Sequence, residues 1–196
     1  MQTNALANIP TGSFTGTLAG LFQKGLRYSS VIDVGCADGH FYVHHYGLGL
    51  FPGSAVLNID PNPVYENSLK SIKDVIGGHY AIAAASDSEG EIELTMSAHP
   101  YWSSLRPSDD SYWERINHME QGTTKVPAVT LDRLAARLGV SGPYLIKLDA
   151  QGAEVQVLRA PGNCSRRQTW SSAKPTWTTS KPSIRPSSRP NLVCST

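Results

Sequence analysis

The clearest structural signal in the chain is the sequence Val31-Ile-Asp-Val-Gly-Cys-Ala-Asp-Gly-His40. A short apolar run is followed by Gly35 and Gly39, which lie four residues apart. This pattern predicts a buried strand over residues 29–34, a tight turn, and a helix from near Asp38 to about Leu48. Gly35 permits the sharp turn because it has no Cβ, and Gly39 allows the new helix to lie close to the strand and to a ligand.

The spacing of these glycines distinguishes between kinds of cofactor. The dinucleotide-binding fingerprint is Gly-x-Gly-x-x-Gly, but this chain has Asp-x-Gly-x-x-x-Gly, with Ala37 and Asp38 in place of the third glycine. A nicotinamide-dependent oxidoreductase is therefore a disfavoured alternative. The pattern resembles the first motif of S-adenosylmethionine (SAM) dependent methyltransferases. That ligand has no pyrophosphate, so its loop needs close backbone approach and an acidic partner.

A second apolar run, Ala55-Val-Leu-Asn-Ile-Asp60, predicts the next strand. It ends in an acid about 20 positions after Gly39, which is where doubly wound folds place the residue that binds ribose hydroxyls. Prolines at positions 61 and 63 stop the strand. Asp60 is therefore predicted to bind a ribose, and the alternative is that it caps the following helix.

The chain then alternates between apolar runs typical of strands and patterns typical of helices. Strands are expected over residues 80–85, 91–96, 125–129 and 144–149, and helices over residues 63–76, 130–138 and 153–158, with Val64, Leu69, Ile72 and Val75 facing inward in the first helix. Pro127 indicates an edge strand, because proline cannot donate to the ladder. Residues 97–124 are expected to form a loop or lid. The alternation predicts an α/β fold with a mostly parallel, Rossmann-like sheet.

Composition divides the 196-residue chain near residue 160. Residues 1–28 are expected to be a helical or irregular segment, and residues 29–160 the SAM-binding domain. Residues 161–196 form a basic Ser/Thr/Pro-rich tail without acidic residues or apolar periodicity, so we expect it to be disordered. We also expect the methyltransferase sheet to be truncated at this C-terminal side. Whether the tail is native or the product of a frameshift stays open.

Charge, hydropathy and cysteine content exclude several classes of function. Residues 1–160 carry no basic patch, so no nucleic-acid partner is expected, and no apolar stretch is long enough for a membrane span. The N-terminus has no early lysine or arginine and no continuous apolar segment, so a secretory signal is not expected. Cys36, Cys164 and Cys194 lie far apart, which argues against a disulfide framework or a zinc site and favours a cytoplasmic location. The six histidines have no metal-binding spacing; His44 and His45 are expected on a helix surface, and His40 near the cofactor.

Residues 30–160 resemble the FkbM-type SAM-dependent methyltransferases. The resemblance rests on the order and spacing of five stretches: Val31–Gly35 with Gly39, Asn58–Pro63, Ala84–Gly90, Val126–Asp132, and Leu145–Asp149 continuing through Gln151–Glu154 to Leu158. It implies O-methylation of a small hydroxylated acceptor such as a sugar or a secondary metabolite. An inactive, truncated methyltransferase-like domain is the main alternative.

The candidate site follows from where the strands end. In an open α/β sheet the ligand lies at the carboxyl ends of the strands, where several acids converge. The expected cofactor-binding residues are Asp33, acting on the methionine amino group indirectly or through water, the loop glycines Gly35 and Gly39, Asp60 at the ribose, and Ser86 and Asp87 at the adenine. Asp149 is the expected catalytic base, or else a helix cap.

Two further expectations concern the strand over residues 144–149. Lys147 interrupts its apolar pattern, and we expect it either to pair with a carboxylate or to lie at the surface. A truncated sheet would leave this strand without a neighbour on one side, so self-association through the exposed edge is expected.

Overall fold

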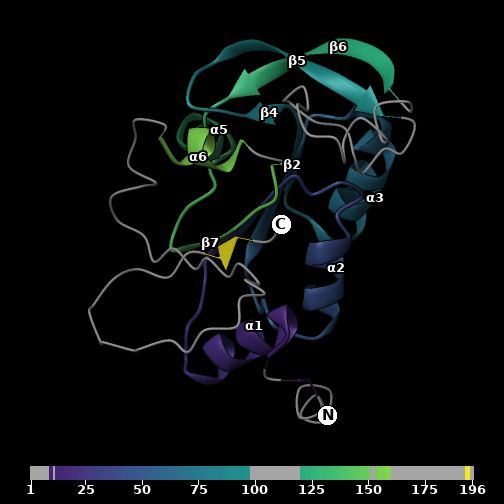
Figure 1. The fold of residues 1–196 in the computed structure, drawn as a ribbon. Helices are drawn as coiled ribbons and strands as arrows, with labels where there is room; N and C mark the ends of the chain where they lie inside the picture. The colour runs from purple at the N-terminus through teal and green to yellow at the C-terminus, as the bar shows by residue number, and fades with distance from the viewer. Residues whose placement is uncertain (1–8, 11, 98–119, 151–152, 160–192, 195–196) are drawn as a thin grey trace, which may run out of the picture.

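A five-stranded parallel sheet forms the centre of the computed structural model, which describes residues 9–10, 12–97, 120–150, 153–159 and 193–194. The strand order is β3-β2-β1-β7-β8, and every neighbouring pair is parallel (Figure 1). The strands are β1 (Ser30–Val34), β2 (Ala55–Asp60), β3 (His79–Ile82), β7 (Tyr144–Leu148) and β8 (Val193–Cys194). The expected α/β fold with a mostly parallel, Rossmann-like sheet is confirmed.

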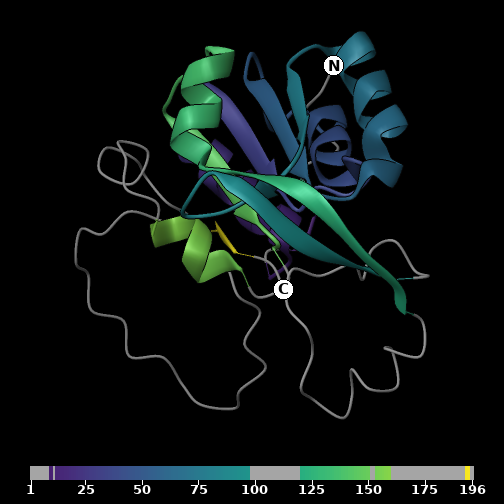
Figure 2. The same cartoon turned by 90° about the horizontal axis from the view of Figure 1, so that it is seen from above.

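Helices cover both faces of this sheet, which is why β1 and β7 are buried at every position. One face packs against α5 (Leu131–Leu138) and α6 (Glu154–Arg159), and the other against α1 (Phe14–Gln23) and α2 (His40–Gly47). In Figure 2 the green helix α5 lies on one side of the parallel strands and the blue helices α2 and α3 on the other. Alternate residues of β1 belong to the two apolar clusters, Ile32 to the first and Val31 to the second.

The segment after β2 begins with a short 3₁₀ helix, η1 (Pro63–Tyr65), and continues as α3 (Glu66–Ile76). Leu69 is fully buried, as expected, but Val64 and Val75 are 57 % and 84 % exposed, so their expected inward position is wrong. The 3₁₀ turn separates Val64 from the helix proper. Val75 lies about 120° around the helix axis from Leu69 at 3.6 residues per turn. The helix ends at Gly77, whose φ is 91°.

The expected strand over residues 80–85 is two strands in two different sheets. β3 ends at Ile82 in the parallel sheet, and β4 (Ala84–Ala85) joins a second sheet with β5 (Gly90–Ser97) and β6 (Glu120–Val129). Between them, the N–H of Ala83 donates to the carbonyl oxygen of Asp60 at 3.0 Å. An unbroken apolar run gives no sign of such a change of partner, although the half-buried β3 and the buried β4 lie in different sheets.

The strand that contains Pro127 is the middle strand of the second sheet and not an edge, since the order is β4-β6-β5. β4 pairs only with Ala128 and Val129, so β6 has a single partner strand, β5, at Pro127. The missing N–H of the proline is therefore tolerated in a middle strand. β6 begins at Glu120, which corrects the expected loop over residues 120–124; residues 98–119 of that loop lie outside the described residues.

The edge of β7 is partly covered. β8 pairs in parallel with Lys147 and Leu148, so the expectation of a strand without a second neighbour is wrong at these two positions. Apart from β8, the expected tail lies outside the described residues, and self-association stays a prediction. Within the described part of the chain, no helix combines the length and apolar character needed to cross a bilayer.

Candidate functional site

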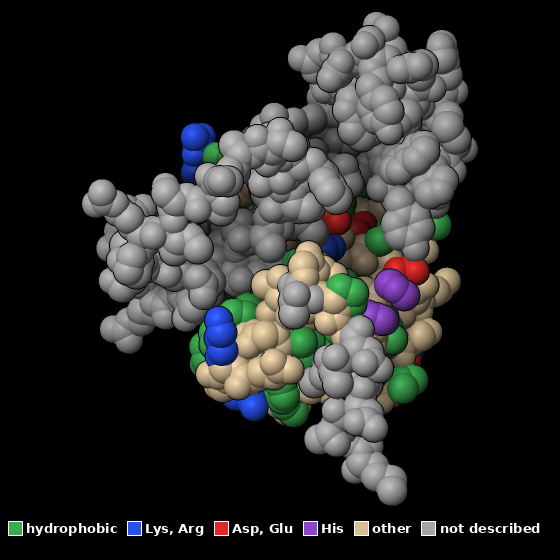
Figure 3. All heavy atoms as spheres, turned by 60° about the horizontal axis from the view of Figure 1, so that its bottom comes forward, with side chains coloured by type: hydrophobic (Ala, Val, Ile, Leu, Met, Phe, Trp, Pro, Cys, Tyr) green, Lys and Arg blue, Asp and Glu red, His purple; other side chains and the backbone are tan. Residues whose placement is uncertain are grey.

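A cavity of about 370 Å³ opens at the carboxyl ends of β1, β2 and β7. β2 and β3 extend the sheet from one side of β1, and β7 lies on its other side. The order of the strands therefore reverses at β1, and open α/β sheets bind ligands at such a switch point. The lining consists of Val34–Asp38, His40, Phe41, Ile59–Asn62, Tyr65, Ala83–Ala85, Leu94, Lys147, Asp149 and Ala150. Figure 3 shows acidic and basic side chains together in a recess of the surface, with histidines at its border.

The turn after β1 is closely packed against the end of β7. Gly35 has φ 66°, and a Cβ at this position would fall on the carbonyl oxygen of Asp149, so only glycine fits. Ala37, at the tip of the turn, also has a positive φ, 49°. A left-handed backbone costs a non-glycine residue roughly 1–2 kcal/mol. The Ala37 N–H offsets part of this cost by donating to Oδ2 of Asp60 at 2.8 Å.

Asp60 fixes this turn from the neighbouring strand. Its Oδ1 accepts a hydrogen bond from the N–H of Asn62 at 2.9 Å, so each carboxylate oxygen binds one backbone donor. Each oxygen retains acceptor capacity for a ligand hydroxyl. Burial raises the pKa of Asp60, and the two backbone donors oppose that shift. The alternative of a helix cap is wrong, because Asn62 caps η1 by accepting from the N–H of Val64 at 3.1 Å.

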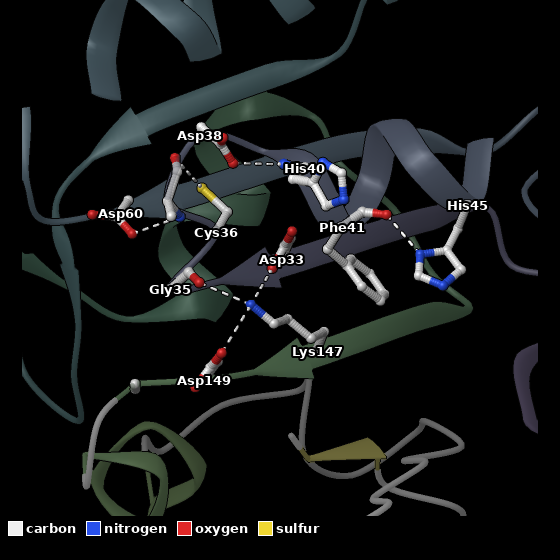
Figure 4. Close-up of polar contacts among 12 residues, drawn as sticks. Asp33, Gly35, Cys36, Asp38, His40, Phe41, His45, Asp60, Lys147 and Asp149 are labelled. Atoms are coloured by element: carbon white, nitrogen blue, oxygen red, sulfur yellow. Dashed lines mark hydrogen bonds and ion pairs between the residues drawn. The ribbon is translucent and has the colours of Figure 1, made fainter. Parts of the chain in front are cut away.

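The strongest charge cluster of the site is centred on Lys147. Its Nζ lies 3.0 Å from Oδ1 of Asp33 and 3.6 Å from Oδ2 of Asp149, and it donates to the carbonyl oxygen of Gly35 at 2.8 Å (Figure 4). Lys147 and Asp33 are register neighbours on β7 and β1. The expected pairing of Lys147 with a carboxylate is confirmed, whereas the alternative of a surface position is wrong, since the residue is 7 % exposed.

Asp33 is fully buried and does not line the cavity, so Lys147 and not Asp33 reaches the space for a ligand. Sequence reasoning left the role of Lys147 open. The signal that could have decided it is the position of a lysine inside a short apolar strand, because a buried ammonium requires a charged or hydrogen-bonding partner.

Burial and charge act in opposite directions on these groups. Burial raises the pKa of Asp33 to about 6, although the Lys147 ammonium opposes the shift. Burial also raises the pKa of Asp149, again against the effect of Lys147. Burial lowers the pKa of Lys147, but the carboxylates of Asp33 and Asp149 raise it more, so the net shift is upward. Lys147 is therefore a cation at neutral pH.

Asp149 is the carboxylate of this cluster that lines the cavity, and it is half-buried. Its backbone N–H donates to the carbonyl oxygen of Val34 at 3.0 Å, which holds the residue beside the glycine turn. Close to α6, Oε1 of Glu154 accepts from the N–H of Ala150 at 3.1 Å, whereas the Asp149 carboxylate faces Lys147. The position is compatible with a general base.

Besides Asp33, three of the expected cofactor residues lie outside the cavity lining. Gly39 is the N-cap of α2 with φ 80°, and a Cβ there would fall on the Ile72 side chain, so its close approach is to α3. Ser86 is buried directly after Ala85, the last lining residue of β4, and Asp87 is exposed in the turn that follows. Contact of Ser86 and Asp87 with adenine stays a prediction.

The histidines of α2 differ from one another. His40 is exposed and lines the cavity, as expected for a residue near the cofactor. His45 is only 5 % exposed, so its expected surface position is wrong: its ring contacts Oγ1 of Thr15 at 3.0 Å and the carbonyl oxygen of Phe41 at 2.7 Å. Burial lowers its pKa. Among the described residues, no group of three His, Cys, Asp or Glu side chains could hold a metal ion.

One comparison with known proteins identifies a family. A family model described as the methyltransferase FkbM domain matches residues 33–184, a range that includes Asp60, Lys147 and Asp149. No curated protein and no solved structure matches the chain significantly.

Proposed function

The chain belongs to the FkbM methyltransferase family, and we propose that it transfers a methyl group from SAM to a hydroxyl oxygen of a small acceptor, such as a sugar or a secondary metabolite. The family match supports the transfer of a methyl group. The choice of SAM is supported by the charge and shape of the cavity at the strand ends, and the oxygen acceptor is what the family resemblance implies.

The charge of the cavity is the observation that carries the choice of cofactor. Of the described residues, three carboxylates line it, those of Asp38, Asp60 and Asp149, against one ammonium, that of Lys147, which Asp33 already neutralises. SAM carries a sulfonium and an amino group, which are cations, whereas the pyrophosphate of a nicotinamide dinucleotide is an anion that needs backbone N–H donors. An acidic lining therefore favours SAM and disfavours the dinucleotide.

The shape of the cavity supports the same choice. Its volume of about 370 Å³ lies within the range of roughly 300–1,000 Å³ typical of small-molecule sites. Ala83, Ala84 and Leu94 form an apolar wall suited to a flat base. The unused lone pairs of the Asp60 carboxylate suit the two hydroxyls of a ribose. When bound, SAM supplies an electrophilic methyl group on its sulfonium.

The residues of this chain would contribute position and a proton acceptor. In-line displacement requires the acceptor oxygen, the methyl carbon and the sulfur to be aligned, and alignment alone contributes several kcal/mol. Asp149 would accept the proton of the acceptor hydroxyl as the oxygen–carbon bond forms and the carbon–sulfur bond breaks, which leaves a neutral thioether. Because burial raises the pKa of Asp149, it is a better proton acceptor than an ordinary aspartate, and a positioned base contributes about 10²–10⁴-fold.

Calorimetric titration of the full chain with SAM and, separately, with NAD tests the choice of cofactor. We expect heat of binding in the titration with SAM and none in the titration with NAD. Asp60→Ala should weaken SAM binding by about 1–3 kcal/mol through the lost hydrogen bonds, while Asp74→Asn, on the exposed face of α3, serves as the matched control and should leave it unchanged. Binding of NAD without SAM would reject the proposal.

Transfer of a labelled methyl group from SAM to a panel of sugars and small alcohols tests the reaction. Label in a product that Asp149→Asn abolishes is the expected result. SAM binding without transfer to any acceptor would favour the alternative of an inactive methyltransferase-like domain. A cytoplasmic location belongs to the same proposal, supported by the three widely spaced cysteines.

A further inference from the structure

We propose that Lys147 is the positioning residue of this site: its ammonium group ties the carboxylate of Asp149 to Asp33 and to the glycine turn, and so holds the base at the cavity wall. The inference rests on the proposed function for the role of Asp149 as base. The contacts that carry it belong to the chain alone.

Three oxygen atoms from three segments of the chain surround the Lys147 ammonium group. A protonated lysine has three N–H donors, and Nζ of Lys147 has three oxygen neighbours: the carbonyl oxygen of Gly35 at 2.8 Å, Oδ1 of Asp33 at 3.0 Å and Oδ2 of Asp149 at 3.6 Å. These oxygens come from the middle of β1, the turn after β1 and the residue after β7. One side chain therefore links three segments that meet at the cavity wall. Figure 4 shows the three contacts.

The surroundings of Lys147 disfavour a role as a general base or as an electrophile. A general base must be able to lose its proton, but Lys147 is nearly buried between two carboxylates, which keep it charged. The closest oxygens to its ammonium group belong to the chain itself, the carbonyl of Gly35 and the carboxylate of Asp33. The ring of Phe41, 5.8 Å from Nζ, adds a further contact that favours the cation. Lys147 therefore acts through the groups that it holds.

Asp33 lies behind Lys147 and away from the cavity. It is fully buried, it does not line the cavity, and its side chain lies on the same face of the sheet as its register neighbour Lys147. Among the described residues, neither carboxylate oxygen of Asp33 has a well-aligned hydrogen-bond partner, and the ion pair of Oδ1 with Lys147 is the contact that compensates its charge. Asp33 therefore serves as the buried counter-charge that keeps Lys147 in place, and its expected indirect action on the methionine amino group stays a prediction.

The contact with Asp149 is the longest of the three, which fits a group that must react. A carboxylate bound at 2.8 Å would be held rigidly and would be a weak proton acceptor. At 3.6 Å, Lys147 orients the carboxylate and leaves its proton affinity above that of an ordinary aspartate. The charged or titratable groups that act on the Asp149–Lys147 pair are Asp33, Cys36, Asp60 and Glu154.

The test is a carboxyl-carbon NMR titration of Asp149 in the full chain without ligand. An opposite charge within 4–6 Å lowers a carboxyl pKa by about 1–3 units, so Lys147→Met should raise the pKa of Asp149 by a similar amount. Lys147→Arg, which keeps the charge, should stay close to the wild-type chain. Lys70→Met removes the lysine of the exposed pair Lys70–Asp74 on α3, and as the control it should leave the Asp149 titration unchanged.

A second variant predicts a shift of the opposite sign. In Asp33→Asn, Lys147 loses its closer carboxylate and is expected to move toward Asp149, whose pKa should then fall. A lysine that only supports the fold would lower the melting temperature in both variants without moving the Asp149 titration in opposite directions. An Asp149 pKa equal to that of the wild-type chain, in either variant that folds, would overturn the proposal.

The wild-type chain provides a measurement that needs no variant. A nearly buried ammonium with a hydrogen bond and two ion pairs exchanges its protons slowly, so Lys147 should give a nitrogen-15 signal at neutral pH, assigned by nuclear Overhauser contacts to Asp33 and the Phe41 ring. Its absence would contradict the proposed arrangement even if both variants fail to fold.

These outcomes separate this proposal from the proposed function. Opposite shifts of the Asp149 pKa in a chain that does not bind SAM would reject the cofactor and keep the role of Lys147. Binding of SAM, together with an Asp149 titration that is unchanged in the Lys147 and Asp33 variants, would keep the cofactor and reject the role of Lys147.

Discussion

Asp33 and Asp60 lie on neighbouring strands of the same sheet and are both almost completely buried, yet they are stabilised in different ways. Each oxygen of Asp60 accepts a backbone N–H, from Ala37 and from Asn62. Asp33 instead has the Lys147 ammonium as its counter-charge. The backbone donors belong to the turn itself, so Asp60 shapes the cavity directly, whereas Asp33 acts on the cavity only through the side chain of Lys147.

The comparison shows how one residue type serves two purposes. A carboxylate held by main-chain donors keeps its place when neighbouring side chains are changed. A carboxylate held by a buried ammonium depends on that single partner, because removing one member of a buried ion pair leaves the other charge uncompensated. The two regions should therefore respond differently to substitution and to pH.

The largest effect is expected for Lys147→Met, which removes the partner of Asp33. A buried pair that loses one member typically costs about 3–5 kcal/mol, so the free energy of unfolding in urea should fall by that amount at pH 7. Asp33→Asn combined with Lys147→Met should restore a large part of the loss. A single variant as stable as the wild-type chain would show that Asp33 does not depend on Lys147.

The next effect is the pH dependence that Asp33 contributes. Its pKa in the folded chain is about 6, above the ordinary value of 3.8, so its ionised form destabilises the fold above both values. This cost disappears as the pH falls from about 6 toward 4. Relative to Asp33→Asn, the wild-type chain should therefore gain up to about 3 kcal/mol of stability between pH 7 and pH 4. Urea unfolding of both chains across this range measures the difference, and parallel curves would contradict it.

A smaller effect is expected for Asp60→Asn. The amide keeps one acceptor oxygen but presents an NH₂ group to the other backbone N–H, so one hydrogen bond is lost and the free energy of unfolding should fall by about 1–3 kcal/mol. The loss should be similar in a Lys147→Met background, because the donors of Asp60 are backbone groups. A double-mutant cycle measures this, and a strong dependence on the background would remove the distinction between the two regions.

The smallest effect is expected for Lys70→Met on the surface of α3. Its pair with Asp74 has an N–O distance of 2.6 Å, shorter than the 3.0 Å between Lys147 and Asp33, but both side chains are more than half exposed. Water and salt screen such a pair, so the melting temperature should not change measurably. A melting temperature as low as that of Lys147→Met would show that distance, not burial, decides the value of these pairs.

Local patterns were sufficient for the framework of the parallel sheet. Apolar runs ending in acids predicted β1, β2 and β7 to within a residue or two, and the spacing of Gly35 and Gly39 predicted a turn that leads into a helix. These features depend on backbone conformation and on burial of a whole strand, and both leave a mark in a few consecutive residues. The same patterns placed Gly35, Asp60 and Asp149 at the cavity.

The sequence by itself therefore determined the fold class, the glycine turn and the acids at the strand ends. The tertiary structure alone decided what those acids face: Asp33 is paired inside the sheet with Lys147, and Asp60 binds the turn, while Ala83–Ala85 with Leu94 add an apolar wall to the cavity. The same holds for the burial of His45 and for the middle position of β6. The physical reason is that a buried charge is stabilised by whichever partner the packing of distant segments brings within about 4 Å, and the spacing of residues along the chain does not encode that distance.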